Sequence, residues 1–171
     1  MGKMKIILAV ALFIISATGP TFAQNNAVQD IFDKYTGQEG FTSVQLGNGV
    51  LSLLSSLDKD DPDLQKMAKS LHSLKILIAD ESASHINFED ELKGKVDFSG
   101  YKEMMTIKEK DENVRILARE NGGIIKELLM LVNGTDENVL IFMDGSFLLK
   151  DLASMGSLNV EGIDHLKELE E

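Results

Sequence analysis

The spacing of hydrophobic and polar residues changes character near residue 100. Before that point, apolar residues recur three or four positions apart, as Ala27, Ile31 and Tyr35 do, which predicts an amphipathic helix. After it, four strand-like runs follow one another with short turn-like gaps between them, which is typical of a β-meander. The four runs span residues 103–108, 114–119, 124–132 and 139–143.

The earlier half also contains strand-like segments between its predicted helices. Phe41–Leu46 alternates weakly and predicts a short strand, and helical spacing resumes over 50–57. Pro62 follows an aspartate, a pattern typical of a helix start, and the helix it begins carries Leu71 on its apolar face. The apolar run Leu74–Ala79 then predicts a buried strand.

Three further helices are expected: one that begins at Phe88 and ends near Gly94 or Gly100, one over 148–155 and one over 163–169. No internal repeat, low-complexity tract or linker interrupts the chain. We therefore predict a single α+β domain with a mostly antiparallel sheet, its C-terminal meander packed with helices.

The central meander strands are apolar at both odd and even positions. Every residue of 128–132 and of 139–143 is hydrophobic. Because alternate side chains point to opposite faces of a sheet, both faces of these strands must be covered. Helices can cover one face, and the other requires a second helical layer of the same chain, a second subunit or a ligand cavity.

The first 23 residues have the pattern of a secretory signal peptide. Lys3 and Lys5 precede a ten-residue apolar run, and Thr21-x-Ala23 supplies the small residues of a cleavage site. The run is too short for a transmembrane helix, which needs about 20 residues. We expect a signal peptide over 1–23 and the folded domain over 24–171, exported to the periplasm or secreted.

Charge and composition narrow the class of partner. The chain has a net charge of −11, which becomes −13 when Lys3 and Lys5 leave with the signal peptide. Such an acidic protein repels nucleic acid and anionic membrane surfaces. The chain contains no cysteine, which excludes thiolate chemistry, iron–sulfur clusters and the lipid anchor of a lipoprotein. We expect a soluble protein with no cofactor and no stable membrane span after cleavage.

Two sets of residues are candidates for a site. Asp80, Glu81 and His85 follow a buried strand, and they would form an acid/base or metal cluster if the loop brought them together; a solvated loop is the alternative. Arg115 and Arg119 lie on the first predicted hairpin with other charged residues. Cross-strand ion pairing and a charged binding face both explain them. Motifs for serine hydrolases, zinc ligation and phosphate binding are absent.

The chain also resembles a known family. The resemblance extends over nearly the whole of 24–171, and it implies a fold family without a named activity, so it transfers no catalytic residue. The family is the secreted domain of unknown function DUF4252, typical of Bacteroidetes-type bacteria. The residues that carry the resemblance are Phe32-x-x-Tyr35-x-Gly37-x-x-Gly40-Phe41-Thr42-x-Val44, Asp111-x-x-Val114-Arg115, Ile125-x-Glu127-Leu128-Leu129-x-Leu131-Val132, Val139-Leu140-Ile141 and Gly145.

The function expected from these observations is non-enzymatic. The chain would be an interaction or ligand-binding module of the bacterial cell envelope that works through Arg115 and Arg119, with a protein or small-molecule partner, or as a homodimer. One alternative is a hydrolase or metal-dependent protein that uses Asp80, Glu81 and His85. Another is a structural envelope or adhesin-type subunit that pairs through an exposed edge strand.

Cleavage of the signal peptide during export should leave a mature protein with a defined N-terminus. The intact mass of the protein recovered from the exported fraction should correspond to a chain that begins at Gln24. A mass that retains Met1–Ala23 would contradict the assignment of a cleaved signal peptide.

Overall fold

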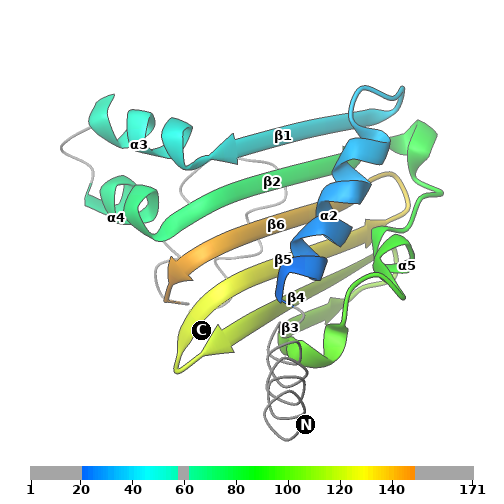
Figure 1. Ribbon diagram of the computed structural model, residues 1–171. Coiled ribbons are helices and arrows are strands. Elements are labelled where there is room, and N and C mark those ends of the chain that lie inside the picture. The colour runs from blue at the N-terminus through cyan, green and yellow to red at the C-terminus, as the bar shows by residue number, and fades with distance from the viewer. Residues whose placement is uncertain (1–20, 58–61, 149–171) are drawn as a thin grey trace, which may run out of the picture.

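The computed structural model describes residues 21–57 and 62–148, which are organised around one antiparallel sheet (Figure 1). Its six strands lie in the order β1-β2-β6-β5-β4-β3, and every neighbouring pair is antiparallel. The predicted α+β class and the C-terminal meander are therefore confirmed. The strands are β1 (Phe41–Gly47), β2 (Leu71–Ala79), β3 (Lys102–Lys108), β4 (Glu112–Asn121), β5 (Ile124–Gly134) and β6 (Asn138–Phe147).

The meander runs β3-β4-β5-β6, and β2 then pairs with the free side of β6. The tight turn between β4 and β5 requires glycine, because Gly122 and Gly123 have φ of +61° and +81°. Only glycine adopts such angles without strain, as expected for a two-residue hairpin turn. The sheet edges are β1 and β3.

Helices lie on one face of the sheet and at one end of it (Figure 1). The helix α2 crosses the face, and the short helix α5 lies beside it, against β5 and β6. The helices α3 and α4 lie where β1 ends and β2 begins. Within the described residues, none of these helices has the length and hydrophobicity needed to cross a membrane. Their bounds are α2 (Thr21–Tyr35), α3 (Asn48–Leu57), α4 (Pro62–Ser70) and α5 (Phe88–Leu92).

The central strands are buried on both faces, as predicted. Leu129 and Met130 are consecutive residues of β5, and both side chains are completely buried. Leu129 packs in a cluster with residues of α2 and α5, whereas Met130 belongs to a second cluster whose described members all lie on strands. Alternation along the strand places the two clusters on opposite faces of the sheet.

Several element boundaries differ from the prediction. The helix α4 ends at Ser70, and Leu71 instead begins β2, where it is buried opposite Gly145. The absence of a side chain at Gly145 allows this approach, since a Cβ there would collide with the Ser70 carbonyl. The helix α5 ends at Leu92, close to the expected end near Gly94 rather than Gly100, because Lys93 leaves the helical conformation and Gly94 has φ of +76°.

Another difference concerns the connection between β5 and β6. Asn133 and Gly134 fall in the turn-like gap predicted after 124–132, but they still belong to β5, and the chain turns over 135–137. Other expectations fall on residues that the structure does not describe: most of the signal peptide (1–20), the capping residue before Pro62, the helix over 163–169 and, except for its first residue, the helix over 148–155. The helix α2 begins at Thr21, ahead of the expected mature N-terminus.

The burial of both faces predicts that neighbouring residues of β5 are equally costly to truncate. Leu129→Ala and Met130→Ala should each lower the free energy of unfolding by about 2–5 kcal/mol, because each leaves a cavity on its own side. Ile124→Ala, at a position 40% exposed, is the control and should have a much smaller effect. Urea denaturation measures all three, and a large loss at only one of the two buried positions would contradict two-sided burial.

Candidate functional site

Arg115 lies on the face of the sheet that carries the helices. It is two residues before Leu117, which packs in the cluster with α2 and α5, so both side chains point to the same side of β4. Its neighbours across the sheet are Thr106 on β3 and Leu131 on β5. The arginine therefore stands where the buried apolar part of this face gives way to polar positions.

The Arg115 guanidinium joins the sheet to α5. Nη1 donates to Oε1 of Glu89, in the first turn of α5, while Nη2 and Nε donate to Oε2 of Glu103 on β3, at 3.0 and 3.2 Å. Cross-strand ion pairing, one of the two interpretations of this hairpin, is thus present. The pKa of the Glu103 carboxyl lies below its ordinary value, because the Thr106 hydroxyl and Arg115 both donate hydrogen bonds to it.

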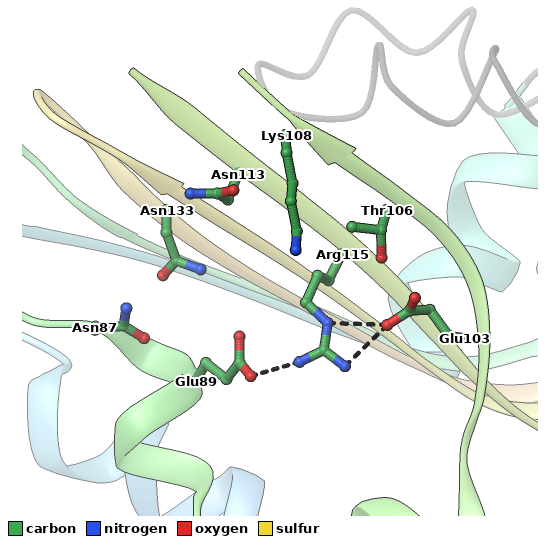
Figure 2. A pocket seen from close by; sticks show the side chains of 8 residues that line it. All are labelled: Asn87, Glu89, Glu103, Thr106, Lys108, Asn113, Arg115 and Asn133. Atoms are coloured by element: carbon green, nitrogen blue, oxygen red, sulfur yellow. Dashed lines mark hydrogen bonds and ion pairs between the residues drawn. The ribbon is translucent and has the colours of Figure 1, made fainter. Parts of the chain in front are cut away.

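A polar cavity of about 420 Å³ opens beside this ion-pair group (Figure 2). Its lining has two basic, two acidic and four neutral hydrogen-bonding side chains, contributed by β3, β4, β5 and the start of α5. The charges of the lining cancel, so the cavity favours neither a strongly acidic nor a strongly basic occupant. The lining residues are Asn87, Glu89, Glu103, Thr106, Lys108, Asn113, Arg115 and Asn133.

Two asparagines hold the helical side of the cavity in place. Asn87 caps α5, with its Oδ1 accepting from the backbone N–H of Asp90 at 3.1 Å. Asn138, 3% exposed at the start of β6, donates from Nδ2 to the carbonyls of Ser84 and Ile86 at 2.7 and 2.9 Å. Its Oδ1 accepts from the backbone N–H of Gly134. The loop that leads into α5 is therefore tied to the end of the β5–β6 hairpin.

Arg119 belongs to a different group at the opposite end of the same face. Its guanidinium lies 4.7 Å from the centre of the Tyr101 ring, and Nε is 3.4 Å from Oε2 of Glu127. The Tyr101 hydroxyl donates to that same oxygen at 2.6 Å, and Glu127 is only 8% exposed. Burial, together with the Glu127 carboxylate, raises the pKa of Tyr101 above its ordinary value. Arg115 and Arg119 thus share a face of β4 without sharing a cavity.

The other candidate residues, Asp80, Glu81 and His85, lie in the loop that follows β2. Asp80 accepts hydrogen bonds from the backbone N–H and the hydroxyl of Ser82, at 2.9 and 2.6 Å, and these bonds lower its pKa. Glu81 and His85 are exposed. Within 21–57 and 62–148, no three histidine, aspartate or glutamate side chains are grouped as a metal ion would require. Asp80 thus caps the short 3₁₀ turn Glu81–Ala83.

Most of the residues that the structure brings together around Arg115 and Arg119 cannot be predicted from the sequence. Glu89 and Asn87 are distant in sequence from β4, and no spacing rule connects them with Arg115. Nothing in the spacing of the sequence predicts Tyr101 or Glu127 as a partner of Arg119. The available signal was the alternation of β4, which places Asn113 and Arg115 on one face.

These features define a class of protein: an α+β domain whose antiparallel sheet carries a polar cavity at one end. The family model for DUF4252, a domain of unknown function, matches residues 35–155, and the chain belongs to this family. The match includes the whole cavity lining. No curated protein and no solved structure matches the chain.

The Tyr101–Glu127 contact predicts a pH-dependent contribution to stability. Tyr101→Phe should lower the free energy of unfolding by about 1.5–3 kcal/mol at pH 7, since a hydrogen bond to a buried carboxylate is lost. A pKa raised by folding stabilises the protein below the unfolded pKa of about 10, and that stabilisation declines at higher pH. Urea denaturation at pH 7 and pH 11 should therefore show a smaller difference between the two proteins at pH 11. A difference independent of pH would contradict this.

Proposed function

We propose that this DUF4252 protein is a non-enzymatic ligand-binding module of the bacterial cell envelope and that the cavity beside Arg115 is its binding site. The observation that carries the proposal is the cavity itself. Its volume of about 420 Å³ lies within the range of small-molecule sites, and all eight lining side chains can hydrogen-bond. The envelope location rests on the signal-peptide pattern of residues 1–23.

The contacts that hold the cavity walls in place favour a binding function. Arg115 fastens α5 to β3 through two carboxylates, and Asn138 fastens the loop before α5 to the β5–β6 hairpin. A ligand that enters such a cavity finds the polar groups already oriented, so less conformational entropy is lost on binding.

The charge state of the lining favours binding over catalysis. Arg115 is paired with both Glu89 and Glu103, and the one negative charge that these three groups leave is balanced by Lys108 in the same lining. The lowered pKa of Glu103 keeps this carboxylate ionised at neutral pH, whereas a general acid needs a raised pKa. This cluster is suited to holding a polar molecule and poorly suited to transferring a proton to it.

Ligand titration followed by NMR tests this function. We expect polar metabolites of the envelope, added in mixtures to the ¹⁵N-labelled exported protein, to include compounds that shift the backbone amides of the cavity residues saturably. Thr106→Trp should abolish those shifts by filling the cavity, because Thr106 lines it. Thr42→Trp, at an exposed position of the edge strand β1, is the matched control and should preserve them.

Two results would overturn the proposal. One is that no compound in the mixtures shifts the cavity amides. The other is that the shifts persist in Thr106→Trp, which would place the bound compound outside the cavity.

A further inference from the structure

Lys108 is the cation of the cavity that no carboxylate neutralises directly. Arg115, the other cation of the lining, is engaged by Glu89 and Glu103. In the described part of the chain, Lys108 forms no ion pair within 4.0 Å and no side-chain hydrogen bond. Figure 2 shows its ammonium group pointing into the space between Asn113, Asn133 and Arg115. Its charge acts on Glu103 only through space, where it helps to lower the pKa of that carboxyl, so its ammonium group has no direct ion-pair partner in the cavity.

Asn133 adds neutral hydrogen-bond donors beside that charge. Its Oδ1 is buried and accepts no hydrogen bond within the described residues. Figure 2 shows its amide nitrogen on the side of the cavity toward Lys108. An ammonium and an amide N–H that converge in this way suit an oxyanion, because charge-assisted hydrogen bonds to it are short and strong.

The opposite wall carries an acceptor of the complementary kind. Glu89 uses Oε1 to bind Arg115, and Figure 2 shows its second carboxylate oxygen facing the cavity. That oxygen suits a ligand cation. The two carboxylates of the lining, together with a chain charge of −11, repel a dianion such as a phosphate group.

We propose that the ligand is a small zwitterion of the amino-acid class. Its carboxylate lies between Lys108 and the Asn133 amide, and its ammonium group lies at the free oxygen of Glu89. This assignment rests on the proposed function, since it names the occupant of the same cavity. One negative and one positive ligand group leave the neutral charge balance of the lining unchanged.

Four small probes separate the parts of this assignment. L-alanine carries both charges, propionate only the carboxylate, ethylamine only the ammonium, and inorganic phosphate is the competing anion. In NMR titrations of the exported protein, L-alanine should shift the cavity amides with an affinity at least about tenfold higher than each of the other three. Phosphate binding the cavity more tightly than L-alanine would overturn the assignment.

A matched pair of lysine variants tests the position of the carboxylate. Lys108→Gln should weaken L-alanine binding by about tenfold or more, because the charge-assisted contact is lost. Lys110→Gln removes the same charge from an exposed turn outside the cavity and should leave the affinity unchanged. Equal effects of the two substitutions would overturn the role of Lys108.

The titrations also distinguish a wrong ligand class from a wrong binding function. If other polar compounds shift the cavity amides and L-alanine does not, the ligand class is wrong while the binding function stands. If no compound shifts them, the ligand class and the proposed function both fail.

Discussion

Burial of the central strands on both faces is the constraint on which the rest of this structure depends. Leu129 and Met130 are adjacent in β5 and are buried on opposite sides of the sheet. Each such side chain contributes about 1.5–3 kcal/mol through the hydrophobic effect, so these strands are held from two sides. Polar side chains are excluded from the middle of these strands, and they gather toward strand ends, as Asn133 does on β5 and Asn138 on β6.

Arg115 connects this apolar framework to the polar cavity. Its side chain is 30% exposed, so the ion pairs with Glu89 and Glu103 are partly screened by water and contribute modestly to stability. Their main effect is geometric, because one planar donor group fixes the first turn of α5 relative to β3. The ion pairs that hold α5 against β3 therefore help to form the cavity, and the same side chains contribute charges to its lining.

The sequence predicted the sheet better than the site, and the reason is physical. Strand alternation and turn residues are local, so the meander and the burial of both faces of β5 and β6 were predictable from residues 124–143. The start of β2 at Leu71 depends on its pairing with Gly145, which no local pattern contains. Glu89 likewise reaches Arg115 only after α5 has folded onto the sheet.

Hydrogen exchange in the native state tests most directly the claim that two-sided burial stabilises the centre of the sheet. The account predicts that the backbone amides of Leu129 and Met130 exchange only on global unfolding, with the free energy measured by denaturation. The amides of the edge strand β1 should exchange through smaller, local openings. Exchange of the β5 amides as fast as those of β1 would contradict the account, because a sheet held from both sides must be most stable at its centre.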